Sequence, residues 1–124
     1  MLIVDDQEPF RLAALAVIAV TPGFVTVGQA ATGEESVEAA ARLDPDLVLM
    51  DVILPGIDGI EAARRIREHS PRAVVLLLST YGRADFESRL AEAGAAAFIP
   101  KSDFGPQLLA GAWAAARETS TTSE

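Results

Sequence analysis

The sequence predicts an α/β fold, in which a parallel five-stranded sheet lies between two layers of helices as a doubly wound (βα)5 three-layer sandwich. Two observations lead to this prediction. Short apolar runs alternate with longer segments of helical character along the 124 residues. Three of these runs are nearly continuous Leu, Ile, Val or Met, which is typical of strands that helices cover on both faces.

Five strands are predicted, and each is followed by a helix. The strands lie at residues 2–4, 24–29, 47–50, 74–78 and 97–99. Right-handed crossovers connect parallel strands of this kind, so the helices are distributed over both faces of the sheet.

The helix boundaries are marked by residues that favour helix ends. Starts are indicated by first-turn prolines and by pairs with the spacing of a capping box: Pro9 and Pro106, Thr32 with Glu35, and Asp58 with Glu61. Stops are indicated by turn-forming residues: Thr21-Pro22-Gly23, Asp44-Pro45, Ser70-Pro71 and Gly94. The polar residues 119–124 are expected to form a disordered tail or a truncated linker, which leaves residues 1–118 as one domain.

The composition excludes several classes of function. The chain has 18 acidic and 10 basic residues, a formal charge of −8, and no cysteine. Nucleic acids and anionic membranes bind through basic residues, so neither is expected to be a direct partner of this domain. The absence of cysteine excludes disulfides, iron–sulfur clusters and thiolate zinc sites. No apolar run approaches the ~20 residues that cross a bilayer, and a basic signal-peptide flank is absent, so a cytoplasmic location is expected.

Acidic residues end two of the predicted strands. Asp5 and Asp6 follow the first strand, and Asp51 follows the third. In a flavodoxin-like sheet, with strand order 2-1-3-4-5, these strands are neighbours, and ligands bind at their carboxyl ends. Each aspartate alone is more simply explained as a solvated loop residue. Three converging carboxylates, however, repel one another unless a cation compensates their charge, and Mg²⁺ is the cation that fits such ligands.

A hydroxyl and an ammonium group are predicted at the same edge. Ser79 ends the fourth strand and Lys101 follows the fifth. Taken singly, a serine at this place is usually a turn former, and a lysine is usually solvated. Together with the carboxylates they supply a donor, a cation and a nucleophile at one site.

Four stretches of sequence, in this order and spacing, form a highly specific pattern. They are Leu2-Ile3-Val4-Asp5-Asp6, Asp46-Leu47-Val48-Leu49-Met50-Asp51 continuing into Leu54-Pro55-Gly56-Ile57-Asp58-Gly59, Leu77-Leu78-Ser79, and Ala97-Phe98-Ile99-Pro100-Lys101. With them the chain resembles, over essentially its whole length, the receiver domain of two-component response regulators, of the type often joined to helix-turn-helix transcription regulators.

The resemblance implies a role for each site residue. Asp51 would be the phosphoacceptor, assisted by Lys101 and Ser79. Mg²⁺ would be held by Asp5, Asp6 and Asp51 together with the backbone carbonyl of Ile53. Ser79 and Phe98 would form the switch, in which the hydroxyl bonds to the phosphoryl group and the ring turns inward. Ile53 and Tyr81 are bulky at positions that influence attack by water in this family, so slow self-dephosphorylation is expected.

The resemblance also implies partners. A sensor histidine kinase or a small phosphodonor would supply the phosphoryl group. The surface of the fourth helix, fifth strand and fifth helix would then change and control an output such as transcription. A homodimer through that surface or through faces of the first and fifth helices, and a DNA-binding output domain missing from this chain, complete the expected partners.

The leading interpretation is a signalling switch that catalyses its own phosphoryl transfer and dephosphorylation, not a turnover enzyme. A non-phosphorylated pseudo-receiver that serves as an interaction module is one alternative, but such a module is expected to lose an acidic residue or the lysine. A phosphatase with an aspartyl nucleophile is a weaker alternative, because those enzymes usually carry Asp-x-Asp, whereas Val52 and Ile53 follow Asp51.

Two apolar features leave alternatives open. Residues 10–20 carry a single charge, Arg11, so either alanines occupy the outer side of this helix or the helix offers a docking face for the helical bundle of a kinase. Trp113 shares a helical stripe with Leu109. It is either a core residue or an exposed anchor of an interface.

Overall fold

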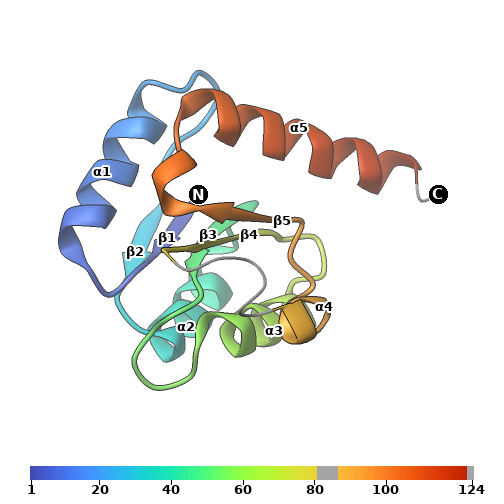
Figure 1. Cartoon of the computed structure of the whole chain (residues 1–124). Coiled ribbons are helices and arrows are strands. Elements are labelled where there is room, and N and C mark those ends of the chain that lie inside the picture. The colour runs from blue at the N-terminus through green and yellow to red at the C-terminus, as the bar shows by residue number, and fades with distance from the viewer. Residues whose placement is uncertain (81–86, 123–124) are drawn as a thin grey trace.

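The computed structural model describes residues 1–80 and 87–122, and it confirms the predicted fold class (Figure 1). Five parallel strands form one sheet in the order β2-β1-β3-β4-β5. The strands are β1 Leu2–Val4, β2 Gly28–Ala30, β3 Leu47–Asp51, β4 Val74–Ser79 and β5 Ala97–Pro100. Helices α1 Glu8–Ala19 and α5 Pro106–Thr122 cover one face, and α2 Gly33–Leu43, α3 Gly59–His69 and α4 Leu90–Ala93 cover the other.

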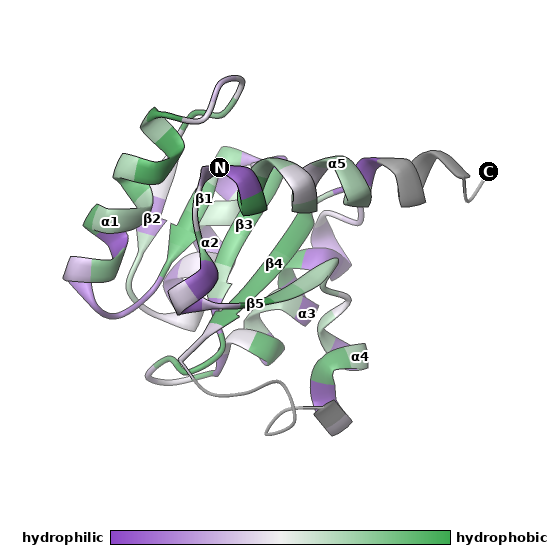
Figure 2. Ribbon diagram, turned by 45° about the horizontal axis from the view of Figure 1, so that its top comes forward, coloured by the Kyte–Doolittle hydropathy of each residue, from purple (hydrophilic) through white to green (hydrophobic). Residues whose placement is uncertain are grey.

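Two apolar clusters pack against the two faces of the sheet, because successive side chains of a strand point to opposite faces. The cluster beneath α2 and α3 includes Leu2, Val4, Val48, Met50 and Leu77. The cluster beneath α1 and α5 includes Ile3, Leu47, Leu49, Leu76 and Leu78. All of β1 and β3 is buried, and Figure 2 shows most of β3 and β4 as hydrophobic. The continuous apolar runs therefore form the centre of the sheet.

The predicted starts of α2 and α3 are present, but each capping box forms only in part. The Thr32 side chain accepts a hydrogen bond from the Glu35 N–H at 3.0 Å, and Asp58 accepts one from the Glu61 N–H at 2.9 Å. The reciprocal hydrogen bonds, from the backbone N–H of Thr32 and Asp58 to the two glutamate side chains, are replaced by other contacts of these glutamates. The Glu35 carboxylate accepts from the Ala31 N–H at 3.4 Å, and the Glu61 carboxylate binds arginines of its own helix.

The second strand is shorter than predicted. The sequence places it at residues 24–29, whereas β2 spans Gly28–Ala30 and pairs Gly28 with Leu2. Val25 and Val27 lie before this ladder and are 71% and 45% exposed, although their backbones hydrogen-bond to Met1. β-branched residues are enriched in strands, but this propensity does not fix where pairing with a neighbouring strand begins. The predicted start of this strand is therefore wrong.

The fourth and fifth helices differ in length. α4 has four residues, follows the 3-10 turn η2 at Glu87–Arg89 and ends at Gly94 in the left-handed conformation. α5 continues to Thr122, into the segment for which the sequence predicts a tail, and the domain division at residue 118 stays a prediction. Among residues 1–80 and 87–122, no helix combines the length and apolar character needed to cross a bilayer.

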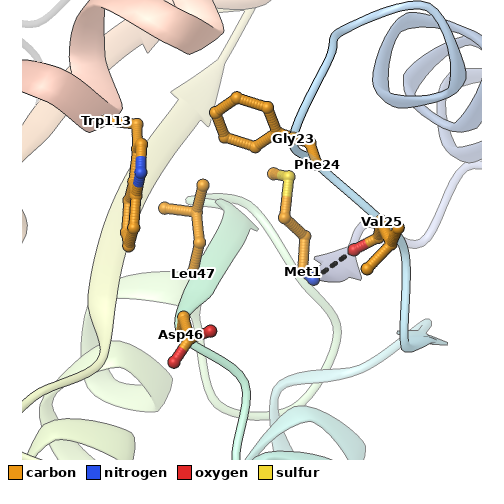
Figure 3. Close-up of a pocket in the computed structure, with 7 residues that line it drawn as sticks. All are labelled: Met1, Gly23, Phe24, Val25, Asp46, Leu47 and Trp113. Atoms are coloured by element: carbon orange, nitrogen blue, oxygen red, sulfur yellow. Dashed lines mark hydrogen bonds between the residues drawn. The ribbon is translucent and has the colours of Figure 1, made fainter.

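Trp113 lies at the amino ends of the strands, beside a pocket of about 100 Å³ (Figure 3). Its ring meets that of Phe24 edge-on, with centroids 6.4 Å apart, and both side chains are partly buried against the cluster beneath α1 and α5. This favours the core interpretation of Trp113. On α1, the outer side carries alanines together with Leu12, which is 57% exposed, and the docking face stays a prediction.

Candidate functional site

Three carboxylates meet at the carboxyl edge of the sheet, where β1 and β3 are paired. Asp5 and Asp6 follow β1, and Asp51 is the last residue of β3. Asp5 and Asp51 are buried and Asp6 is exposed. Each residue offers a carboxylate oxygen, and these oxygens lie within 4.8 Å of one another. The structure thus brings together the three aspartates that the sequence predicts to converge.

Lys101 brings a positive charge to these carboxylates. It begins the 3-10 turn η3, Lys101–Asp103, directly after β5, and its side chain is 10% exposed. Its Nζ lies 2.5 Å from Oδ2 of Asp5 and 3.3 Å from Oδ2 of Asp51. The ammonium therefore compensates part of the negative charge that the sheet edge concentrates.

Burial and charge set the protonation of the two central groups. Burial, and after it the charge of Asp5, raise the pKa of Asp51 to about 6, against the opposing effects of Lys101 and of the Ile53 N–H. Burial disfavours the ammonium of Lys101, but its contacts with Asp5 and Asp51 outweigh burial and raise its pKa. At neutral pH, Asp51 is mostly ionised and Lys101 is protonated.

The loop after β3 fixes the backbone of Asp51. The Val52 N–H donates to the Leu78 carbonyl at 2.9 Å, and the Gly59 N–H donates to the Val52 carbonyl at 2.8 Å. A Cβ at Gly59 would lie 1.9 Å from the carbonyl oxygen of Asp51, so this close approach requires glycine. The start of α3 therefore rests directly against the acidic edge.

The donor set fits a hard divalent cation. Oδ1 of Asp5 accepts a hydrogen bond from the Gln7 N–H at 2.8 Å. Oδ2 of Asp5 is buried, and the Lys101 ammonium, 2.5 Å away, is its charge partner. A buried carboxylate oxygen that needs a cation beside it is suited to be a metal ligand. Because carboxylate and carbonyl oxygens are the ligands that Mg²⁺ prefers, Asp5, Asp6 and Asp51 form a candidate Mg²⁺ site.

Three other predicted site residues lie on β4, on β5 and in the loop after β3. Ser79 is buried at the end of β4, one residue beyond the Leu78 that pairs with Asp51. Phe98 lies on β5, partly buried against the cluster beneath α2 and α3. The Ile53 side chain is 48% exposed, and its N–H donates to Oδ1 of Asp51 at 3.3 Å. Tyr81 lies outside the described residues.

Two residues of α1 contact the site and are not among the predicted site residues. Arg11 donates from Nη1 to the backbone carbonyl of Asp5 at 2.7 Å and from Nε to Oε1 of Gln29 at 3.2 Å. The Phe10 ring lies beneath Lys101, with Nζ 4.6 Å from the ring centroid. Arg11 has a sequence signal, because it is the one charge within residues 10–20. Phe10 has no sequence signal that distinguishes it from a core residue.

A parallel α/β sandwich with three carboxylates and a lysine at the carboxyl edge of its sheet defines the receiver class of signalling domains. The chain belongs to the response regulator receiver domain family, whose model matches residues 1–112. Response regulator GacA of Pseudomonas viridiflava is 41% identical over 101 residues, which cover 82% of this chain and 47% of that protein. Protein-glutamate methylesterase/protein-glutamine glutaminase 4 of Geobacter metallireducens is 41% identical over 103 residues, or 82% of this chain and 30% of that protein.

Solved structures agree with this assignment. A two-component response regulator of the LuxR family from Aurantimonas sp. SI85-9A1 superposes with a TM-score of 0.84 at 32% identity, over 94% of this chain and 84% of that one. The response regulator domain of Thermotoga maritima CheB gives a TM-score of 0.80 at 31% identity, over 94% of both chains. The chain spans about half or less of the curated relatives named above. Their shared part is a signalling domain.

Proposed function

We propose that this domain is a phosphorylation-dependent switch of a two-component system, in which Asp51 accepts a phosphoryl group from a sensor histidine kinase or a small phosphodonor. The observation that carries the proposal is the position of Lys101 between the carboxylates of Asp5 and Asp51, in a cluster of carboxylates that fits Mg²⁺. Membership of the receiver family supports it, because switching by phosphorylation is general for that family.

Asp51 is suited to act as the nucleophile. One of its carboxylate oxygens forms a bond to phosphorus while the bond from phosphorus to the donor's imidazole nitrogen, or to the acetate oxygen of acetyl phosphate, breaks. The donor keeps the electron pair of the broken bond. Lys101 offers positive charge to the oxygens of the transferred group. Asp5, Asp6, Asp51 and the Ile53 carbonyl would hold Mg²⁺, which would neutralise further charge on those oxygens.

The switch is assigned to Ser79 and Phe98. The Ser79 hydroxyl would bond to the phosphoryl group, and the Phe98 ring, which lines a pocket of about 100 Å³ with Leu77 and Leu90, would turn inward. Phosphorylation favours the state whose contacts it improves. The surface made by α4, β5 and α5 would change as a result and control an output such as transcription.

The remaining partners follow from the same proposal. They are the sensor kinase, a second copy of the chain bound through the α4-β5-α5 surface or through faces of α1 and α5, and a DNA-binding output domain. The net charge of −8 supports the prediction that the domain itself does not bind nucleic acid. The cytoplasmic location stays a prediction.

Intact mass spectrometry tests the proposal. The native protein and Asp51→Asn are incubated with acetyl phosphate and Mg²⁺, and with EDTA in place of Mg²⁺. One phosphoryl group is expected on the native protein, only with Mg²⁺, and none on Asp51→Asn. A phosphoryl group that persists on the variant contradicts the role of Asp51. A native protein that accepts none favours the pseudo-receiver, and continuous hydrolysis of the donor favours a phosphatase.

A further inference from the structure

We propose that Phe10 is a positioning residue, which holds the Lys101 ammonium beside Asp51 during phosphoryl transfer. This inference rests on the function proposed above and extends it to a residue outside the predicted acidic edge. The Phe10 ring is the third contact of the Lys101 ammonium, after the carboxylates of Asp5 and Asp51.

The contact has the geometry of a cation over an aromatic face. Nζ of Lys101 lies 4.6 Å from the centroid of the Phe10 ring, within the ~6 Å over which a ring attracts an ammonium. The lysine head group is carried on a flexible four-carbon stem, so the contacts at its end decide where the charge sits. The Lys101 side chain is 10% exposed, and water therefore weakens this attraction less than at an open surface.

Contacts of Phe104 and Arg11 hold Phe10 in place. Phe104 packs against Phe10 with centroids 6.3 Å apart and an interplanar angle of 48°. The Phe104 N–H in turn donates to the Lys101 carbonyl at 3.2 Å, which closes the turn that carries the lysine. Arg11, the next residue along α1, anchors this helix to the Asp5 carbonyl at 2.7 Å. Phe10 is thus fixed relative to both Lys101 and Asp5.

The ring contact differs from the two carboxylate contacts in one respect. In the proposed function, Asp51 is converted to an acyl phosphate, and Asp5 is a candidate metal ligand, so both ion pairs of Lys101 change during the reaction. The Phe10 ring takes part in neither change. It can therefore keep the ammonium in place when its carboxylate partners are altered. A residue that merely fills the core would not need an aromatic face.

Substitution of the Phe10 ring separates a role in positioning the Lys101 ammonium from a role in filling the core. Phe10→Leu keeps an apolar side chain without the aromatic face, and Phe10→Tyr keeps the face. Phe24→Leu is the matched control, because Phe24 is also partly buried in the cluster beneath α1 and α5 but packs against Trp113 at the opposite edge of the sheet. The rate of Asp51 phosphorylation by acetyl phosphate is measured for the native protein and for each variant. A thermal unfolding curve first shows that each variant is folded.

The expected rate falls about threefold to tenfold in Phe10→Leu, as a lost cation–π contact predicts. It stays near the native rate in Phe10→Tyr and Phe24→Leu. In a Lys101→Ala background, Phe10→Leu is expected to have no further effect, because the two residues act through one contact. Equal losses in both backgrounds would overturn the positioning role, as would a native rate in Phe10→Leu.

A second measurement does not depend on phosphorylation. NMR relaxation of the Lys101 Cε methylene, recorded without Mg²⁺, is expected to show a lower order parameter in Phe10→Leu than in the native protein or in Phe24→Leu. An unchanged order parameter contradicts the proposal. A native protein that accepts no phosphoryl group contradicts the proposed function instead, and the relaxation measurement still decides whether Phe10 orders the lysine.

Discussion

Replacement of Asp51 by asparagine is expected to stabilise the domain at neutral pH in the absence of Mg²⁺. Burial and the charge of Asp5 raise the pKa of Asp51 from 3.8 to about 6 in the folded protein. Between these two values the folded state binds more protons than the unfolded state, so stability falls as pH rises through this window. Above pH 6 the folded protein bears the full cost of the buried charge, and Asp51→Asn removes it.

The magnitude follows from the size of the shift. A shift of one unit corresponds to about 1.4 kcal/mol, so a rise from 3.8 to about 6 sets an upper limit of about 3 kcal/mol. The site lies at an open edge beside the exposed Asp6, and solvent screening there reduces the expected gain to about 1–2 kcal/mol. At pH 4 the asparagine variant should have lost most of this advantage, because Asp51 is then protonated in the folded native protein.

Urea unfolding in EDTA at pH 7.5 and pH 4 measures the effect. The fluorescence of Trp113 reports unfolding, since it is the single tryptophan and lies at the opposite edge of the sheet from the substitution. Asp6→Asn is the matched control, because Asp6 is exposed, and its gain should be smaller. A stability difference between native and Asp51→Asn proteins that is the same at both pH values would refute the reasoning, as would a variant less stable than the native protein at pH 7.5.

Three further changes test the surroundings of the site. Gly59→Ala should destabilise the domain by ~2 kcal/mol or more in thermal unfolding, because its Cβ would lie 1.9 Å from a backbone oxygen, whereas Gly105→Ala meets nothing within 4 Å and should be mild. Arg89→Gln should cost less than ~1 kcal/mol in urea unfolding, because its ion pair with Asp58 is partly exposed; a loss above ~2 kcal/mol would contradict this. Ile53→Asn combined with Tyr81→Glu should shorten the lifetime of the phosphorylated protein in Mg²⁺, and an unchanged lifetime would remove the role assigned to these side chains.

The central strands could be predicted because their chemistry is uniform. β1, β3 and β4 each lie between two neighbouring strands and between two layers of helices, so almost every side chain is buried and almost every residue is apolar. The edge strand β2 is different. Its sequence, Gly28-Gln29-Ala30, carries no strong strand signal, while the β-branched Val25 and Val27 just before it lie outside the ladder. Propensity alone could not show where pairing with β1 begins.

The acidic edge could be predicted for a topological reason. Once strands one and three are neighbours, their carboxyl ends coincide, and Asp5, Asp6 and Asp51 must approach one another whatever the loops do. Side-chain partners are not fixed in this way. Glu61 has the spacing of a capping box, yet its carboxylate binds Arg64 and Arg65, because ion pairs three and four residues apart on a helix compete for the same group. Sequence spacing does not reveal which partner prevails.

The contacts that sequence reasoning missed share one position in the fold, the first turn of a helix that follows a strand. In a βα unit the helix starts at the edge where the strand ends, so its first turn must lie beside the site. Phe10 and Arg11 in α1 touch Lys101 and Asp5, and Gly59 in α3 rests against Asp51. Glu34 in α2 accepts the Ile57 N–H of the loop after β3 at 3.2 Å. A search for acidic motifs does not find residues of this class, but the topology alone is sufficient to nominate them as the residues that support the reacting groups.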